Sequence, residues 1–284
     1  MDKQYTLPEI ESVFADPVAR SGFGAEQASL RIYTLGRFSL VRDGEPLRAT
    51  RKAPSKPLAL LKALIALGGR QVGAVSLASI LWPDKEGDLA QQAFETTLHR
   101  LRKHLGDDRY LLLEDGRLTL NSERVWVDVW AFERNLTALR SLISHDNTSG
   151  CHADVHLRAE HIMRLYQGHF LGREDATCWS VSLQERLRNK YIHCMIALGG
   201  FWEQHGLPDK AILCYQKGIE VDDLVETFYQ RLMVCLDQTG RQPEAIATFR
   251  QCRHILSVVL GLAPMKETRE IYETILAHYQ QQAG

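Results

Sequence analysis

Six polar side chains on one side of a predicted helix carry the most chemical information in this sequence. In residues 88–105 the apolar residues recur every three or four positions, at Ala90, Phe94, Leu98, Leu101 and Leu105. This spacing predicts a helix with one buried face. The opposite side carries Gln92, Thr96, His99 and Lys103, flanked by Glu95 and Arg100. A helix in the major groove uses such groups to read base edges and hold phosphates. The pattern therefore predicts a DNA-contacting helix.

A β-hairpin is predicted directly after this helix. Residues 110–120 place Asp115-Gly116 between two apolar runs, and Asp-Gly is a strong signal for a two-residue hairpin turn. A helix followed by a hairpin suggests the recognition helix and wing of a winged helix-turn-helix. An isolated polar helix face is more often simply solvated surface. The hairpin, and the strands expected before the first helix, favour DNA contact instead.

The residue chemistry suggests a division of labour on DNA. Candidates for reading bases are Gln92, Glu95, Thr96, His99 and Arg100. Glutamine can pair with adenine, a threonine methyl can touch thymine, and histidine or arginine can reach guanine acceptors. Candidates for phosphate or wing contacts are Arg51, Lys52, Ser55, Lys56, Arg102, Lys103 and Arg117. The alternative role for Arg102 is a surface ion pair, worth ~0–1 kcal/mol.

Composition restricts the broad class of protein. The chain has 284 residues, 45% hydrophobic and 24% charged, with a net charge of −1, which suits about two globular domains. Residues 31–128 hold 16 lysines and arginines against 12 acidic residues, a modest local excess that suits DNA contact through one module. Neither a membrane-spanning apolar run nor a signal peptide is visible. We therefore expect a cytoplasmic protein.

The sequence offers no catalytic apparatus or cofactor site. All six cysteines lie in the second half without a Cys-x-x-Cys pair, so we expect reduced core residues and not a zinc site. Nucleophile-elbow, P-loop and HExxH motifs are absent from the sequence. We expect no enzyme, no metal and no cofactor.

The order of predicted elements supports a two-domain reading. Residues 1–29 read as a tail or linker, with a short helix near residues 7–14. Strands are expected from Leu30 to Leu40, with a turn at Asp43-Gly44. Helices follow at about 55–67, with Ser55 as N-cap, and at 75–81. The DNA-binding domain is expected over 30–128, and an all-α domain over 129–284. The expected fold class is mainly α with a small β component.

The second half repeats itself with a period of 34 residues, the length of a tetratricopeptide repeat. The matching pairs are Leu198 and Leu232, Gly206 and Gly240, Ala211 and Ala245, Ile212 and Ile246, and Tyr215 and Phe249. Two clear copies are fewer than such a stack usually needs. The flanking segments 151–167, 179–205 and 264–281 are therefore expected to supply further helices.

Motifs in order through both halves resemble the bacterial transcriptional activators that join an OmpR-type winged helix to a bacterial transcriptional activation domain, as in the Streptomyces antibiotic regulatory proteins. The resemblance covers residues 31–278. Its motifs are Leu35–Phe38, Leu81–Pro83, Leu98–Arg102, Tyr166–Leu171, Trp179 with Glu185–Leu187, Glu226–Met233, Gly240–Ala245 and Leu260–Pro264. The chain departs from the pattern at Thr96 and Thr97 and lacks a proline usually found after Leu171.

The resemblance implies an activator that binds tandem direct repeats upstream of promoters, as a homodimer on double-stranded DNA, and contacts RNA polymerase. The loop matching the polymerase-contacting region carries Trp82, Asp84, Lys85 and Glu86, although Trp82 also suits a core position. An unknown protein or small molecule could act on the repeat half. The alternative is a helical-repeat adaptor, or a signalling fragment of a larger regulator, whose DNA-binding domain is degenerate or conditionally active.

Overall fold

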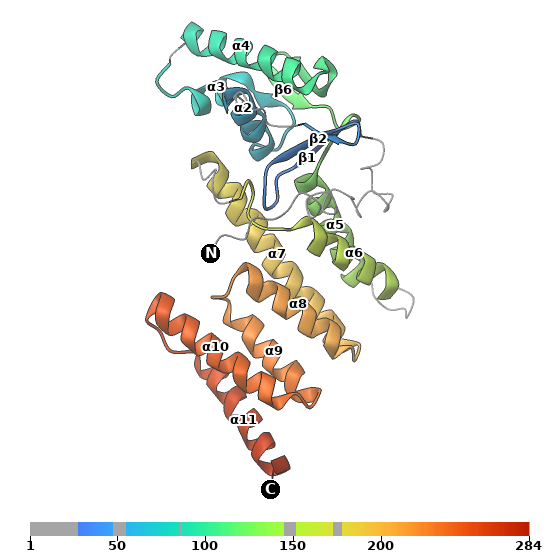
Figure 1. Cartoon of the computed structure of the whole chain (residues 1–284), viewed down its shortest axis with the longest axis vertical. Helices are drawn as coiled ribbons and strands as arrows, with labels where there is room; N and C mark the ends of the chain where they lie inside the picture. The colour runs from blue at the N-terminus through green and yellow to red at the C-terminus, as the bar shows by residue number, and fades with distance from the viewer. Residues whose placement is uncertain (1–27, 48–54, 86, 145–151, 173–177, 284) are drawn as a thin grey trace. The chain divides into compact units, whose positions relative to one another are not determined.

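The computed structural model of the chain describes residues 28–47, 55–85, 87–144, 152–172 and 178–283 (Figure 1). Most of the expected N-terminal tail, with its short helix, lies outside these residues. Contacts divide the chain into two units, residues 1–138 with 160–184, and residues 139–159 with 185–284. This division differs from the single boundary expected after residue 128, because residues 160–184 pack with the first unit.

In its described residues before 128, the first unit contains short strands and three helices. They are β1 (Leu30–Tyr33), β2 (Ser39–Arg42), β3 (Glu45–Pro46), α2 (Ser55–Ala66), β4 (Val72–Gly73), α3 (Ala74–Leu81), α4 (Gly87–Leu105), the 3₁₀ turn η1 (Asp108–Tyr110), β5 (Leu111–Glu114), β6 (Arg117–Leu120) and β7 (Val125–Val127). The predicted strands, helices and hairpin are confirmed. Ser55 was predicted to be the N-cap of this helix, but it is the first residue of α2.

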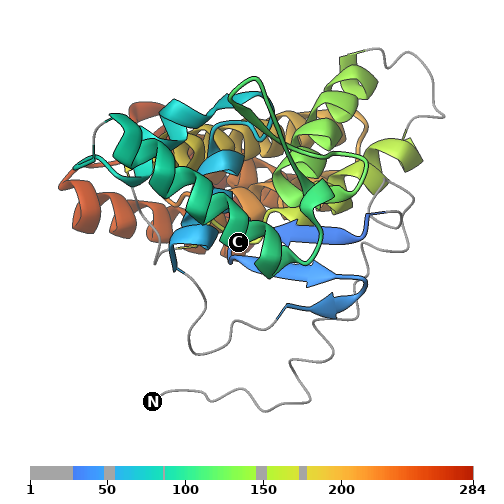
Figure 2. The same ribbon diagram turned by 90° about the horizontal axis from the view of Figure 1, so that it is seen from above.

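One sheet has the strand order β3-β2-β1-β7, and its first three strands are seen in blue in Figure 2. The β1–β2 and β2–β3 pairs are antiparallel, whereas β1 and β7 are parallel, with Leu30 opposite Val125. The predicted turn at Asp43-Gly44 is present, with φ of 50° and 87°. Strand β7 was not anticipated, because a parallel partner distant along the chain leaves no local signature.

The second sheet has the order β4-β6-β5, and its strand β4 contacts α3. Its two-residue strand β4 was also missed, since so short a strand carries no periodicity. Helix α4 packs on both α2 and α3 through its predicted apolar face, on which Phe94, Leu101 and Leu105 are fully buried. The pattern of three and four therefore located the core side of α4 correctly.

A buried carboxylate joins the end of β1 to the start of α5 (Asp128–Ser144). Asp128 is 2% exposed. One of its oxygens accepts from the backbone N–H of Thr34 at 2.5 Å and of Leu35 at 2.7 Å. The other accepts from Thr34 Oγ1 at 2.6 Å and from Val129 N at 2.8 Å. Burial nevertheless raises the pKa of Asp128 to about 6, because desolvation disfavours the charged form.

This raised pKa predicts a pH dependence of folding. Between the ordinary pKa of 3.8 and about 6, the folded protein holds a proton on Asp128 that the unfolded chain has released. Protonation of Asp128 therefore contributes fully to the free energy of unfolding below pH ~4. This contribution falls as the pH rises to ~6 and then levels off, with an upper bound of about 3 kcal/mol. Denaturant unfolding of the wild type and Asp128→Asn across this range checks the prediction. Asp128→Asn should lack this fall in the free energy of unfolding between pH ~4 and ~6. An identical pH dependence in both proteins would contradict the prediction.

A second long-range link joins residues 34–37 to residues 166–172, and we call it the glycine crossing. Leu35 forms an isolated antiparallel bridge with Phe170. Gly36 N donates to His169 O at 2.9 Å, and Leu171 N donates to Thr34 O at 2.6 Å. Leu35 and Phe170 are both buried. The two motifs that came first in each half of the family resemblance therefore meet in one structural element.

The second unit is helical throughout its described residues. Its helices are α8 (Pro208–Val221), α9 (Glu226–Gln238), α10 (Gln242–Leu260) and α11 (Lys266–Ala283), together with parts of α5, α6 (His152–Leu165) and α7 (Cys178–Gln204). The expected flanking helices are thus confirmed. Across the described ranges, no helix combines the length and apolar character needed to cross a membrane.

The 34-residue equivalence holds in three dimensions. Gly206 and Gly240 have φ of 68° and 75° at the turns after α7 and α9, a conformation that glycine adopts without strain. Ala211 and Ala245 are both completely buried, as expected for small residues where paired helices approach closely. The sequence repeat therefore corresponds to two successive helical hairpins, α7–α8 and α9–α10.

Polar contacts connect the two hairpins. The Tyr215 hydroxyl on α8 donates to Glu203 on α7, and Arg231 on α9 lies 2.7 Å from the same carboxylate. Burial, together with this hydrogen bond, raises the pKa of Tyr215. Cys194, Cys214, Cys235 and Cys252 are free and buried, and burial raises the pKa of each thiol to about 12. The four thiols are thus core residues, as predicted.

Candidate nucleic-acid interface

The outer face of α4 presents the predicted base-reading residues together. Gln92, Glu95, Thr96, His99 and Arg100 are all exposed, as is Lys103. The opposite face supplies the core contacts, so these side chains are not needed to hold the unit together. Glu95 accepts a hydrogen bond from Gln91 Nε2 at 2.8 Å. The face can therefore offer donors and acceptors to a ligand, with Glu95 already engaged by a neighbour.

The hairpin after α4 has the predicted turn. Strands β5 and β6 pair with Glu114 opposite Arg117. Asp115 and Gly116 both have positive φ, of 48° and 70°, as in a primed two-residue turn. Arg117 is exposed beside the turn, and its Nη1 lies 3.3 Å from Gln71 O. A basic side chain thus stands at the hairpin tip, where the wing contact was expected.

Arg102 has a structural contact within the unit in addition to the phosphate contact predicted for it. It is only half-exposed, and its Nη2 donates to Leu111 O, the first residue of β5, at 2.7 Å. The guanidinium therefore ties the end of α4 to the base of the hairpin. This bond engages one nitrogen of the half-exposed guanidinium, and the phosphate contact of Arg102 stays a prediction.

The structure describes only some of the other residues predicted to contact phosphates. Arg51 and Lys52 lie outside the described residues. Ser55 and Lys56 are exposed at the start of α2, but Lys56 Nζ donates to Leu81 O at 3.0 Å and lies 5.9 Å from the Trp82 ring. Lys56 therefore already has partners on the segment that follows α3.

The predicted polymerase-contacting loop follows α3. Trp82 is half-buried beneath Lys56, which agrees with the core position considered for it. Asp84 and Lys85 are exposed. Glu86 lies outside the described residues. The exposed members of this loop thus carry one charge of each sign.

Two residues that support this surface were not singled out in the sequence. Arg42, on β2, donates from Nη1 to Leu105 O at 3.0 Å and so caps the last turn of α4. Asp107 accepts hydrogen bonds from the Arg109 side chain and backbone, which lowers the pKa of Asp107 to about 2. The contact of Arg42 depends on where the chain returns, whereas that of Asp107 is local but carries no helical or strand periodicity.

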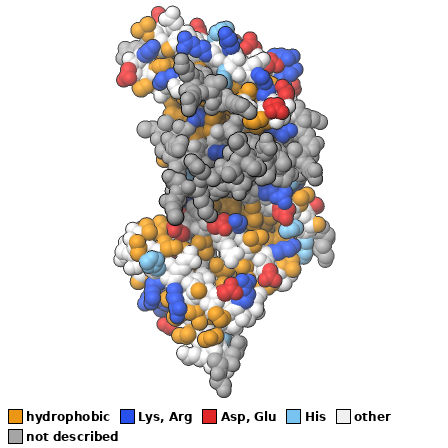
Figure 3. Space-filling model, viewed as in Figure 1, with side chains coloured by type: hydrophobic (Ala, Val, Ile, Leu, Met, Phe, Trp, Pro, Cys, Tyr) orange, Lys and Arg blue, Asp and Glu red, His pale blue; other side chains and the backbone are white. Residues whose placement is uncertain are grey.

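Figure 3 shows the charge on one face of the molecule. Lysine, arginine and histidine side chains lie over the part of the first unit that contains α4, with acidic and apolar side chains between them. Positive charge is thus present but mixed, in keeping with the modest excess counted in the sequence. Such a surface suits a module with a few defined phosphate contacts more than broad electrostatic adhesion.

Comparison with known proteins establishes the class of this chain. The model of the bacterial transcriptional activator domain matches residues 127–276. The chain therefore belongs to the bacterial transcriptional activator domain family, which confirms the resemblance seen in its motifs.

Two relatives are regulatory proteins named AfsR. That of Streptomyces coelicolor is 28% identical over 262 residues, covering 90% of this chain and 25% of the relative. That of Streptomyces griseus is 26% identical over 251 residues, covering 87% and 24%. The chain thus spans about a quarter of the length of these relatives.

A solved structure shares the fold. Mycobacterium tuberculosis EmbR, solved in complex with a low-affinity phosphopeptide, superposes with a TM-score of 0.63 at 20% identity. The match covers 88% of this chain and 65% of EmbR. At this identity the comparison supports the fold alone.

Proposed function

We propose that the chain is a sequence-specific DNA-binding transcriptional regulator, and more specifically an activator that binds tandem direct repeats upstream of promoters and recruits RNA polymerase. Residues 30–128 form an OmpR-type winged-helix DNA-binding domain in this proposal. Residues 129–284 form an activation domain of tetratricopeptide-like repeats. Membership of the activator-domain family and the AfsR relatives support the transcriptional role.

The observation that carries the proposal is the outer face of α4 beside the β5–β6 hairpin. A helix that buries one side on α2 and α3 while presenting amide, hydroxyl, imidazole and cationic groups on the other suits the major groove. The adjacent hairpin, fixed to α4 by Arg102, places Arg117 for a minor-groove or phosphate contact. A merely solvated helix would need neither arrangement.

We assign separate roles to the exposed residues. Gln92, Thr96, His99 and Arg100 read bases, with Glu95 accepting from cytosine. Lys103, Ser55 and Arg117 hold phosphates, and Arg51 and Lys52 join them from the segment outside the described residues. Asp84, Lys85 and Glu86 contact RNA polymerase in this scheme. The protein acts as a homodimer on DNA and without catalysis, and a protein or small-molecule effector acts through the repeat half.

In vitro selection of the full chain against a random duplex pool, at physiological salt, tests the proposal. Enrichment of a direct repeat with a spacing of about one helical turn, ~10–11 bp, would support a dimeric, sequence-specific regulator. If folded protein enriches no sequence, the proposal fails, and the adaptor interpretation becomes the better one.

Variants on α4 should separate base reading from phosphate binding. On the selected duplex, Thr96→Ala or His99→Ala should lower affinity by about 1–3 kcal/mol each while leaving random-duplex affinity nearly unchanged. Lys103→Ala should weaken both duplexes and reduce the salt slope by about one unit. Fluorescence anisotropy over a salt series measures both effects. The matched control is Lys217→Ala, a half-exposed lysine on α8 paired with Glu220, which should change neither. Equal losses on both duplexes for all three α4 variants would refute this division.

A further inference from the structure

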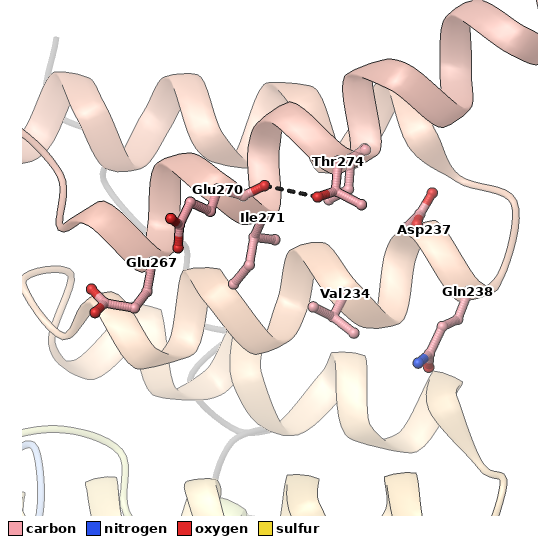
Figure 4. Close-up of a pocket in the computed structure, with 8 residues that line it drawn as sticks. Val234, Asp237, Gln238, Glu267, Glu270, Ile271 and Thr274 are labelled. Carbon is pink, nitrogen blue, oxygen red and sulfur yellow. Dashed lines mark hydrogen bonds between the residues drawn. The ribbon is translucent and has the colours of Figure 1, made fainter.

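The second unit contains an open groove between α9 and α11. It has a volume of about 420 Å³, and α9 contributes Val234, Asp237 and Gln238 to its lining. The α11 residues that line it are Glu267, Glu270, Ile271, Thr274 and Ile275. In Figure 4, Val234 of α9 and Ile271 of α11 point toward one another. Ile275 is buried, whereas Val234 and Ile271 are only half-buried, so apolar surface remains uncovered at the floor.

Polar contacts hold the two helices together at both ends of this groove. At the start of α11, the Glu226 carboxylate on α9 accepts from Met265 N at 2.9 Å and from Thr268 Oγ1 at 2.6 Å. Toward the other end, His278 Nδ1 lies 2.9 Å from Asp237 Oδ2. The walls are therefore fixed while the space between them stays unfilled. A preformed groove of this kind lowers the ordering cost of binding.

The groove carries an excess of negative charge, although two of its carboxylates have a basic neighbour: Lys266 Nζ lies 3.0 Å from Glu270, and His278 Nδ1 lies 2.9 Å from Asp237. Its lining residues include three carboxylates, Asp237, Glu267 and Glu270, and neither lysine nor arginine. Glu267 and Glu270 are exposed, and they lie one helical turn from Ile271 and Thr274 on the same side of α11. The groove thus combines an apolar floor with an acidic rim. Its complement is an apolar side chain flanked by cations.

We propose that the α9–α11 groove binds a basic amphipathic helix of a partner protein. Apolar side chains spaced by four residues would contact Val234 and Ile271, while lysines or arginines on either side meet Glu267, Glu270 and Asp237. This inference rests on the proposed role of the repeat half as the place where a partner acts, and it names that partner's chemistry.

The shape of the groove favours a helix over a small organic cation. Gln238, Thr274 and both glutamates are exposed around it, so the groove cannot enclose a small molecule, whose sites usually bury most of the ligand surface. Apolar surface also continues at the start of α11, where Leu262 and Met265 are each 59% exposed. An elongated partner can use both areas.

Binding of a fluorescein-labelled leucine–lysine amphipathic helical peptide to the full chain tests the proposal by anisotropy. Saturable binding that weakens with added salt is expected. The double variant Glu267→Lys with Glu270→Lys should weaken binding by about tenfold, since two exposed charges worth up to ~1 kcal/mol each are lost. The matched control is Glu273→Lys, an exposed glutamate on α11 outside the groove lining, which should bind like the wild type. Circular dichroism checks that all variants fold.

The outcomes are distinct. No saturable binding, equal weakening by Glu273→Lys, or equal binding of a leucine–glutamate peptide would each overturn the proposal. Displacement of the peptide by low-millimolar spermidine would point instead to a small-cation site and would also overturn it. The same double variant is tested on the selected DNA duplex. Intact DNA binding with lost peptide binding separates failure of this groove from failure of the DNA-binding function.

Discussion

Gly36→Ala is expected to destabilise the first unit by about 3 kcal/mol or more. A β-carbon at Gly36 would lie 2.9 Å from both the backbone carbonyl carbon and the oxygen of Gln167. Backbone atoms in the glycine crossing cannot move aside as a flexible side chain could. The φ of +95° adds strain, because a left-handed conformation costs an alanine roughly 1–2 kcal/mol. The steric and conformational penalties act together at this position.

Gly44→Ala is the matched control for this prediction. Gly44 has a similar φ of +87°, but nothing lies within 4 Å of its added β-carbon. Its substitution should therefore cost only the conformational part, about 1 kcal/mol. Urea unfolding of the two variants, followed by tryptophan fluorescence, measures both losses. Similar losses in the two variants would show that the close approach to Gln167 contributes nothing.

Gly199→Ala is expected to destabilise the second unit by about 2–3 kcal/mol, despite the better helix propensity of alanine. Its β-carbon would lie 2.3 Å from two atoms of the Tyr215 ring. That ring is completely buried, and its hydroxyl donates to Glu203, which also pairs with Arg231. The tyrosine therefore cannot swing away without breaking the polar link between the helical hairpins.

The adjacent residue provides a control with the opposite expected sign. Gly200 lies in the same helix, and nothing lies within 4 Å of its added β-carbon. Gly200→Ala should stabilise the protein by up to about 1 kcal/mol, because alanine favours the helix and restricts the unfolded chain. Thermal unfolding by calorimetry distinguishes the two variants. A stabilising effect of both would mean that Tyr215 relaxes at little cost.

The features predicted from the sequence were those with a local signature. The repeat of three and four in α4 marked Phe94 and Leu101 as core residues and left Thr96 and His99 on the outside. Asp115-Gly116 identified the hairpin, because few other residue pairs tolerate two positive φ values. The 34-residue offset located the buried Ala211 and Ala245. Each inference needed only neighbouring residues or a constant spacing.

The features that escaped prediction depend on residues far apart along the chain. Strand β7 forms by parallel pairing with β1, and Gly36 meets Gln167 from the second half of the chain. The partner of Arg102 is nearer, the carbonyl oxygen of Leu111, whose place is set by the 3₁₀ turn η1 between α4 and β5. Helical periodicity indicates which side of α4 is buried. It gives no information about which long side chain will reach across to a backbone atom.

The two faces of α4 have a consequence for how this protein can diverge. Its stability depends on the side that carries Phe94 and Leu101, whereas substitutions on the exposed side are expected to change stability by no more than about 0.5 kcal/mol. Related genes can therefore accumulate changes at Gln92, Thr96 and His99 without passing through unfolded intermediates. In the proposed function, a lineage of such regulators could acquire new promoters by neutral drift on one helix face while the scaffold stayed constant.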